Sequence, residues 1–297
     1  MEAVPKLTAV CVNYNGAEVL PVLLDCLRAC SPPPRLIVVD SASKDASAED
    51  LGQDVEVVRL EENQGYAAAL NAGIRQALSR PPRADYFLLL NNDLEFEPSA
   101  VAALVECACS REAWVAGPKV VDRQRPWLMD AAWGRLTYSH VLTRFEGKGR
   151  EADDYRQTKS VDLLLGCALL VRRETFDRVG LFDPRYFMYH EEVDFLFRCK
   201  QAGLERLFCP RARFLHRGAY STRRSPLRKV YWVRRNALYF MFKHQPGPAA
   251  WVRWAVTLAA SLLFNLVTLR GRRLSAILRG VRDGFKGGDR PGGQQRS

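Results

Sequence analysis

The stretch DYFLLLNND, residues 85–93, joins five consecutive apolar residues to three small polar residues that end in a carboxylate. An apolar run of this length, bounded by turn residues, predicts a buried β-strand. Ligands of open α/β sheets bind beyond the carboxyl ends of the strands. Asp93 would lie at that edge, where a carboxylate can hold a divalent cation against a diphosphate. The alternative is a simple turn, because Asn and Asp favour turns through local hydrogen bonds.

The pattern around this stretch predicts an α/β fold. Apolar runs predict further strands at residues 7–13, 36–40 and 55–60, and helical spacing predicts helices at 18–30, 66–79 and 99–109. Strands alternating with helices of about a dozen residues indicate a mostly parallel, doubly wound sheet. Polar residues end several of these strands, so a ligand crevice is expected at one sheet edge. Residues 122–160 are polar and irregular, and we expect loops over that crevice.

Charge divides the chain unevenly. The 297 residues carry a net charge of +11, and residues 211–297 hold 19 Lys or Arg against 2 Asp or Glu. The remainder, residues 1–210, is slightly acidic. This asymmetry predicts a polyanionic partner, either a membrane or a nucleic acid.

The C-terminal region favours the membrane. Residues 254–269 contain no charge, and as a helix they would span about 24 Å, short of the roughly 30 Å of hydrocarbon. Residues 274–285 place apolar side chains on one helical face and Arg side chains largely elsewhere, as in an interfacial helix. The alternative is a surface helix packed on the body. We therefore expect a catalytic domain at 1–245, a membrane-associating tail at 246–297, an anionic membrane surface as partner and no nucleic acid.

The eight cysteines form no CxxC pair, and several lie in apolar runs, where free Cys behaves as a small hydrophobe. We expect reduced cysteines and a cytosolic compartment. The first residues lead directly into an apolar strand, without the pattern of a signal peptide.

Three further motifs lie at predicted strand or helix ends. Asn13-Tyr14-Asn15-Gly16 closes the first strand and can present amides to a nucleotide, although such a motif is often only a turn. Asp40 ends the second strand, where it can accept from a base or a ribose hydroxyl, or cap a helix. Residues 63–73 (NQGYAAALNAG) place a glycine turn at a helix start, which is a ready anion site.

Taken in order, these motifs resemble the inverting family 2 glycosyltransferases of the GT-A fold. Within that family they are most similar to the rhamnosyltransferase-like members of bacterial polysaccharide assembly. The resemblance covers residues 7–243. It implies nucleotide-sugar contacts from eight residues: Asn13, Asn15, Asp40, Asn63, Gly65, Asn71, Asn91 and Gly166.

The resemblance also implies a metal site and a base. Asp93 occupies the family's metal-binding position, and His216 matches a histidine that can complete a site for Mg²⁺ or Mn²⁺. Glu192 matches the general base, with Glu191 as the fallback. Members usually have Asp there, so Glu192 adds a methylene. The alternative for this acidic pair is a helix N-terminus whose carboxylates offset the dipole.

The chemistry of these residue types fits glycosyl transfer. A cation held by oxygen ligands neutralises a departing diphosphate, and one carboxylate taking the acceptor proton contributes about 10²–10⁴-fold. We expect a metal-dependent inverting transfer from a dTDP- or UDP-type nucleotide-sugar, with dTDP-rhamnose as the leading donor, to a lipid-linked or glycan acceptor at the cytoplasmic membrane face. The alternatives are an inactive nucleotide-sugar-binding protein of the same fold and a nucleic-acid-binding protein that uses the basic tail.

Overall fold

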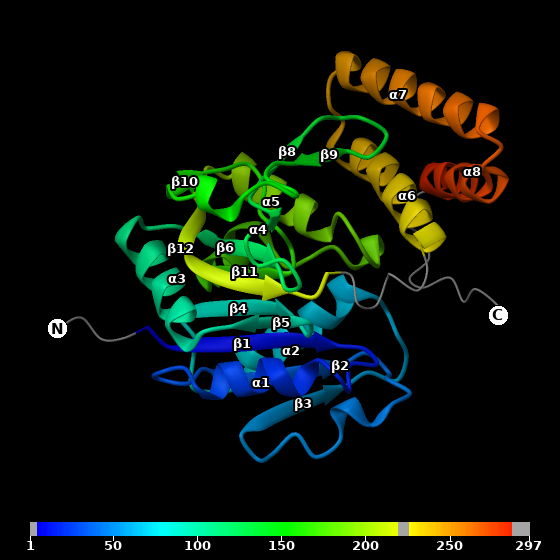
Figure 1. The fold of residues 1–297 in the computed structure, drawn as a ribbon. Coiled ribbons are helices and arrows are strands. Elements are labelled where there is room, and N and C mark those ends of the chain that lie inside the picture. Colours follow the sequence, from blue (N-terminus) through cyan, green and yellow to red (C-terminus); the bar gives the residue numbers. More distant parts are fainter. Residues whose placement is uncertain (1–4, 219–225, 287–297) are drawn as a thin grey trace.

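The computed structural model describes residues 5–218 and 226–286. A ten-stranded sheet forms the centre, with helices on both faces and three helices at the C-terminal end (Figure 1). The strands of this sheet are β1 (Leu7–Asn13), β2 (Arg35–Asp40), β3 (Val55–Arg59), β4 (Tyr86–Asn91), β5 (Leu94–Phe96), β6 (Val115–Asp122), β7 (Met129–Ala131), β10 (Lys159–Ser160), β11 (Ala168–Arg172) and β12 (Arg206–His216). The α-helices are α1 (Leu20–Arg28), α2 (Tyr66–Ser79), α3 (Pro98–Ser110), α4 (Glu174–Val179), α5 (Glu191–Gln201), α6 (Pro226–His244), α7 (Pro248–Val267) and α8 (Gly271–Phe285).

The first half of the sheet is parallel. Strands β3, β2, β1 and β4 lie side by side in that order, and all three pairings are parallel. The register places Asn13 beside Asp40, and Val12 beside Asn91. Because parallel strands end at the same edge, the polar residues that follow them gather there. The predicted α/β fold is confirmed in this half.

The second half of the sheet is mixed. β11 runs antiparallel to both β4 and β6, so the segment before β11 lies at the carboxyl end of β4. The Asn91 amide donates to the Cys167 carbonyl there, at 2.9 Å. β12 pairs with β5 in a register that sets His216 opposite Leu94. That pairing brings His216 next to Asp93, 123 residues away in the chain.

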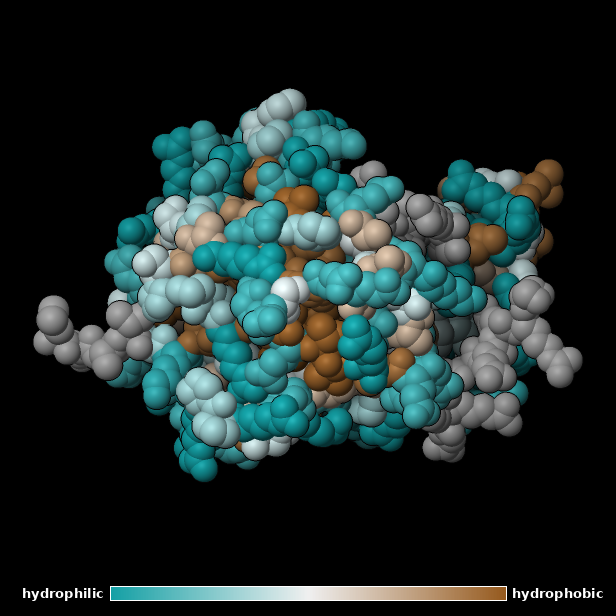
Figure 2. Space-filling view, turned by 90° about the horizontal axis from the view of Figure 1, so that it is seen from below, coloured by the Kyte–Doolittle hydropathy of each residue, from teal (hydrophilic) through white to brown (hydrophobic). Residues whose placement is uncertain are grey.

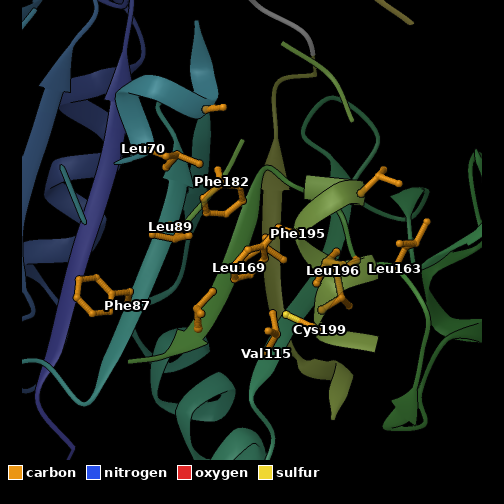
Figure 3. Packing of buried hydrophobic residues seen from close by; sticks show 14 of the residues in the cluster. Leu70, Phe87, Leu89, Val115, Leu163, Leu169, Phe182, Phe195, Leu196 and Cys199 are labelled. Atoms are coloured by element: carbon orange, nitrogen blue, oxygen red, sulfur yellow. The ribbon is translucent and has the colours of Figure 1, made fainter. Parts of the chain in front are cut away.

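Two apolar layers cover the sheet because successive side chains of a strand point to opposite faces. On one face, Phe87 and Leu89 of β4 belong to a buried cluster with residues of α2 and α5 (Figure 3). On the other, Leu88 and Leu90 belong to a cluster with α1 and α3. All four side chains have no exposed surface. The apolar run is continuous because both faces of β4 are covered.

Residues 122–160 are more ordered than expected. This region contains β7, β10, a separate hairpin of β8 (Gly134–Leu136) and β9 (Thr143–Phe145), and the 3₁₀ helix η2 (Ala152–Asp154). The prediction of loops is therefore wrong in part. Each strand here has two or three residues, too few for alternation to show in the sequence.

The prediction that the cysteines are all reduced is wrong for one pair. Cys107 of α3 and Cys209 of β12 form a disulfide. The helix packs against that strand, which brings together two side chains 102 residues apart in sequence. The other six cysteines are free.

The C-terminal helices differ from expectation in two respects. α7 has 20 residues, which corresponds to about 30 Å, so its length and composition would allow it to cross a membrane. The length expected from the uncharged residues 254–269 was too short, because the helix begins earlier, at Pro248, and includes Arg253. On α8, Ile277 is fully buried and packs with Leu238 of α6, so this part of the expected interfacial face packs on the body instead, as in the alternative of a surface helix.

Candidate active site

A cavity of about 520 Å³ opens where β1, β4 and β12 end. Eight of the residues predicted from the sequence line it: Asn63, Gly65, Asn91, Asp93, Gly166, Glu191, Glu192 and His216. Four others, Asn13, Asn15, Asp40 and Asn71, are not in its wall. The fold therefore brings the predicted metal and base residues to one space.

One corner of the cavity combines Asp93 with His216. The Nε2 atom of His216 lies 3.3 Å from Oδ1 of Asp93, and its Nδ1 lies 2.7 Å from Oδ2 of Asp130. Burial favours the neutral ring, but the hydrogen bonds to Asp130 and Asp93 outweigh it and raise the pKa of His216 to about 9. Two carboxylates thus hold a positively charged imidazole between them. This corner favours positive charge.

The side chains at this corner suit a divalent cation that takes its remaining ligands from a substrate. Mg²⁺ is usually held by one or two carboxylates together with substrate phosphates, and an imidazole suits Mn²⁺ as well. Within residues 5–218 and 226–286, no group of three or more His, Cys, Asp or Glu side chains is arranged as a ready metal site. Asp93, together with His216 once its ring has given up the Nε2 proton, would therefore hold a cation whose other ligands come from a diphosphate and water.

The carboxylates of Glu191 and Glu192 lie at the first turn of α5. Burial raises the pKa of Glu192 to about 7, although backbone N–H groups of the helix start oppose it. Burial, and then the charge of Glu192, raise the pKa of Glu191 well above its usual value. Oε2 of Glu191 is buried and has no hydrogen-bond partner among the described residues. A carboxylate that titrates near pH 7 is suited to act as a general base.

Two glycines allow the backbone to approach these groups closely. A Cβ at Gly166 would lie 2.9 Å from Cγ of Glu192, so only glycine leaves this carboxylate in place. Gly65 has φ +92°, and a Cβ there would lie 2.3 Å from the Phe187 carbonyl oxygen. The hydroxyl of Tyr66 donates to the Gly166 carbonyl at 3.4 Å. The loop before β11, the start of α2 and the Glu191–Glu192 pair can therefore pack this closely only because residues 65 and 166 are glycines.

Asn13 and Asp40 lie behind the cavity wall in a polar network. Asn13 Nδ2 donates to Ser47 Oγ at 2.8 Å and to Asp40 Oδ1 at 3.3 Å. Asn13 Oδ1 accepts from Asn92 at 2.8 Å, and Asn15 Oδ1 accepts from a loop amide. These residues brace the turns after β1, β2 and β4. Their contact with a nucleoside stays a prediction.

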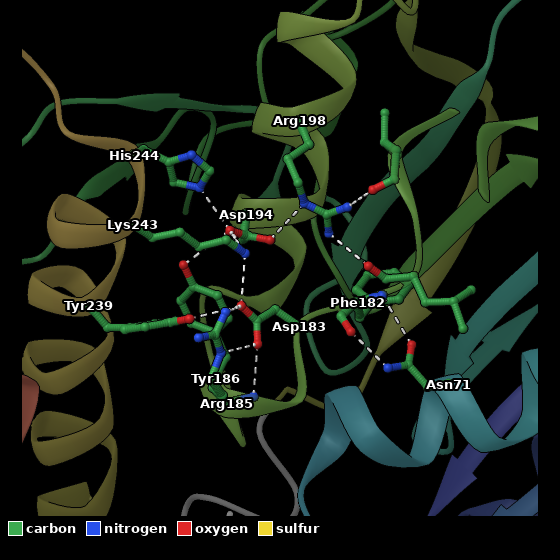
Figure 4. Close-up of polar contacts among 12 residues, drawn as sticks. Asn71, Phe182, Asp183, Arg185, Tyr186, Asp194, Arg198, Tyr239, Lys243 and His244 are labelled. Carbon is green, nitrogen blue, oxygen red and sulfur yellow. Dashed lines mark hydrogen bonds and ion pairs between the residues drawn. The ribbon is translucent and has the colours of Figure 1, made fainter. Parts of the chain in front are cut away.

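Asn71 also has a structural environment. It is 2% exposed, donates to the Phe182 carbonyl at 2.7 Å and accepts from the Phe182 amide at 3.0 Å (Figure 4). Both ends of its amide are thereby used to join α2 to the segment before α5. A direct contact between Asn71 and the donor is not supported by this position.

Some cavity residues carried no clear signal in the sequence. Asp130 lies on a three-residue strand, too short to be recognised. Lys148 and Lys229 line the same cavity from distant parts of the chain, and Lys229 Nζ lies 5.3 Å from the centre of the Tyr189 ring. The charges of both lysines contribute to lowering the pKa of Asp130, after burial, which opposes it, and the hydrogen bond to His216. Only the folded chain brings these residues together.

Residues 8–180 match the family described as Glycosyl transferase family 2. The chain belongs to this family. This family 2 glycosyltransferase is 30% identical to the N-acetylglucosaminyl-diphospho-decaprenol L-rhamnosyltransferase of Mycobacterium tuberculosis (strain ATCC 25618 / H37Rv), across 90% of this chain and 95% of that relative. It is 23% identical to a dTDP-rhamnosyl transferase of Shigella flexneri, across 86% of this chain and 88% of that relative.

A solved structure supports the fold. The mannosyltransferase of Pyrobaculum calidifontis, in complex with GDP-Man and Mn²⁺, superposes with a TM-score of 0.57 at 16% identity, covering 96% of this chain and 88% of that one. The GT-A-like α/β fold and the rhamnosyltransferase-like resemblance are thus confirmed. The protein is a glycosyltransferase.

Proposed function

We propose that this glycosyltransferase moves L-rhamnose from dTDP-rhamnose to a hydroxyl of a lipid-linked diphosphate glycan, with inversion, in a metal-dependent reaction. The observation that carries the proposal is one cavity that contains both a cation-favouring corner, Asp93 with His216, and a partly buried carboxyl, Glu192, whose pKa is raised to about 7. The rhamnosyltransferase relatives support the choice of sugar.

The Asp93–His216 corner would hold Mg²⁺ or Mn²⁺ together with the donor diphosphate. When bound, the cation supplies positive charge that offsets the charge developing on the departing diphosphate. Lys148 and Lys229 line the same cavity and would add charge on the side of Asp130. The dTDP group would lie towards Asn63 and Gly65, at the start of α2, where the helix dipole favours a phosphate.

Glu192 would act as the general base. Its carboxylate accepts the proton of the acceptor hydroxyl while that oxygen forms a bond to the anomeric carbon. The bond from that carbon to the diphosphate breaks, and dTDP leaves with the bonding electrons. One displacement inverts the anomeric centre. Burial and the charge of Glu192 raise the pKa of Glu191 and so favour its protonated form, which would donate a hydrogen bond to the acceptor sugar.

We further propose that residues 1–245 form the catalytic domain and that residues 246–297 attach it to the cytoplasmic face of the membrane. α7 exposes apolar side chains to solvent, with Leu263 61% and Val267 71% exposed. Its uncharged stretch ends at Arg270, beside the exposed Arg272 and Arg273 of α8. The space-filling view shows hydrophobic residues among hydrophilic ones at the edge where α7 and α8 lie (Figure 2). An apolar face bordered by cations suits an anionic membrane surface, where lipid-linked acceptors lie.

The first experiment measures dTDP release from dTDP-rhamnose with a polyprenyl-diphosphate-linked GlcNAc acceptor, with and without Mn²⁺ or Mg²⁺. UDP- and GDP-sugars are the matched donors. We expect metal-dependent release that needs both dTDP-rhamnose and acceptor. Binding of dTDP-rhamnose without turnover on any acceptor would favour the inactive-protein alternative. Turnover of another donor, with none of dTDP-rhamnose, would exclude rhamnose.

The second experiment tests the membrane surface by cosedimentation with vesicles containing phosphatidylglycerol. We expect Leu263→Glu to weaken binding, whereas Leu78→Glu, at a leucine 42% exposed on the catalytic body, leaves it unchanged. Equal binding of both variants would contradict the α7 surface. Stronger binding to DNA than to vesicles would favour the nucleic-acid alternative.

A further inference from the structure

The backbone that leads into the acidic pair is strained. Phe187, Tyr189 and His190 lie between the 3₁₀ helix η3 (Pro184–Tyr186) and α5, and their φ angles are +59°, +68° and +69°. Side chains with a Cβ disfavour this left-handed region. Such residues persist only where surrounding contacts hold them. His190 is the N-cap of α5, so this backbone sets the direction in which Glu191 and Glu192 leave it.

The carbonyl groups of this segment are bound from outside it. Nδ2 of Asn236 in α6 lies 2.8, 2.8 and 2.7 Å from the carbonyl oxygens of Tyr186, Met188 and Tyr189, and its two N–H groups are shared among these three acceptors. The carbonyl of Phe187 accepts from the Tyr66 amide at the start of α2, at 2.6 Å. The carbonyl of Arg185, which precedes these residues, accepts a hydrogen bond from the guanidinium of Arg235 in α6. Five successive carbonyls are therefore held by two other helices.

The amide of Asn236 has one possible orientation here. Its Oδ1 accepts from Arg235 Nη1 at 2.8 Å, so Nδ2 must face the three carbonyls. Asn236 has no exposed surface, so water cannot replace it. An apolar side chain of similar size would leave buried carbonyls without donors, which native structures avoid.

A second contact ties α6 to both sides of the same segment. Lys243 Nζ lies 2.8 Å from Asp183 Oδ2 and 2.7 Å from Asp194 Oδ1 (Figure 4). Asp183 caps η3 before the segment, and Asp194 belongs to the first turn of α5 after it. Tyr239 donates to Asp183 at 2.9 Å as well. The middle of the segment and both its ends are thereby attached to α6.

We propose that Asn236 is a positioning residue for Glu192. By binding the carbonyls of Tyr186, Met188 and Tyr189, it holds the left-handed backbone that aims the first turn of α5 into the cavity. This role rests on the proposed function of Glu192 as the base. It gives α6 a part in the active site that the sequence did not indicate.

The test compares Asn236→Leu with Asn265→Leu in the full chain. Asn265 of α7 is a matched control, because it is 4% exposed and its Nδ2 donates only to a carbonyl of its own helix, that of Ser261. Hydrogen–deuterium exchange of the substrate-free proteins is measured over residues 186–194. We expect amide exchange there to become roughly 10-fold faster or more in Asn236→Leu, and to stay unchanged in Asn265→Leu.

Steady-state kinetics supply the functional readout. In Asn236→Leu we expect kcat to fall about 10- to 100-fold, while the donor KM changes by less than about threefold. The acidic limb of the kcat profile moves to lower pH by about one unit, because a loosened Glu192 is better hydrated. If Asn236→Leu does not fold, Asn236→Gln replaces it, since this variant keeps the amide but displaces it by one methylene.

Unchanged exchange over 186–194 in a folded variant would overturn the proposal. So would a loss in which kcat and thermal stability fall while the donor KM rises, as expected of a merely structural residue. If the wild-type protein turns over no nucleotide-sugar, the proposed function fails. The exchange measurement needs no substrate, so it still decides whether Asn236 holds the segment.

Discussion

Replacing Glu192 by Gln should abolish catalysis and stabilise the protein at the same time. The Glu192 side chain is partly buried beside Glu191 at the edge of the cavity, and its loss of hydration raises its pKa from 4.5 to about 7. Gln has nearly the same shape but cannot accept a proton or carry a charge. If Glu192 is the base, its replacement by Gln should lower kcat and raise the stability. If Glu192 only offsets the helix dipole, the replacement should do neither.

The magnitude follows from the pKa shift. Between pH 4.5 and about 7, the unfolded chain has released this proton while the folded protein keeps it, so the folded state binds more protons and loses stability as the pH rises. At about 1.4 kcal/mol per pKa unit, the ionised carboxylate destabilises the fold by about 3 kcal/mol at pH 8, but only by about 1 kcal/mol at pH 5. With an unfolding entropy of roughly 0.6 kcal/mol per kelvin for a chain of this length, Glu192→Gln gains about 5 °C in Tm at pH 8.

The assay is thermal unfolding from pH 5 to 8, together with dTDP release. Glu106→Gln is the control, because that carboxylate lies on the exposed side of α3 with 63% of its side chain accessible. We expect Glu192→Gln to lose about 10²–10⁴-fold in kcat and to gain Tm increasingly with pH, and the control to do neither. Full activity would refute the base assignment, and a Tm gain independent of pH would refute the burial of an ionising group.

Other outcomes follow from the same site. Asp93→Asn or chelation by EDTA should lower kcat by about 10²-fold or more and remove metal-dependent donor binding, measured by calorimetry, whereas unchanged binding would contradict the cation corner. Gly65→Ala should lower the free energy of unfolding in urea by about 3 kcal/mol, because the new Cβ is strained at this φ and overlaps the Phe187 carbonyl. Gly203→Ala, at a φ of +71° with open space around it, should lower it by only about 1 kcal/mol. Equal losses in the two variants would contradict the close approach at Gly65. The double variant Lys148→Met, Lys229→Met should lower kcat/KM about 10-fold. Burial and the charge of Lys148 lower the pKa of Lys229, and an anion bound between the two lysines would relieve their repulsion. An unchanged kcat/KM would show that these lysines do not contact the substrate.

Local patterns in the sequence were enough to predict the parallel half of the fold. The run Phe87–Leu90 is apolar throughout because helices cover both faces of β4, and residues 66–79 form a helix with the predicted limits. β6 and β12 were missed. Neither alternation nor an apolar run distinguishes them clearly, because β12 mixes arginines with apolar residues and contains a bulge between Cys209 and Arg213.

The site was predictable only where its residues stand in recognisable motifs. Asp93 follows β4, Glu192 lies in the first turn of α5 and His216 is the last residue of β12, and the fold places all three around one cavity. Asp130 and Asn236 had no such signal. The role of each depends on a partner about 50 to 90 residues away, and that pairing exists only after the sheet has formed.

The position of α6 argues that the two proposed parts of the protein are not independent. On one side, Asn236 binds the segment that aims Glu192. On the other, α8 lies so close that a Cβ at Gly280 would be 2.5 Å from the Tyr231 carbonyl oxygen, and one at Gly284 would be 2.9 Å from that of Arg235. Contacts this close transmit a displacement because packed interiors have no slack to absorb it. A membrane that bound α7 and α8 as proposed would therefore act on a helix that also supports the proposed base, Glu192. On this reasoning, vesicles should raise kcat with a water-soluble acceptor analogue, and this gain should disappear in Asn236→Leu.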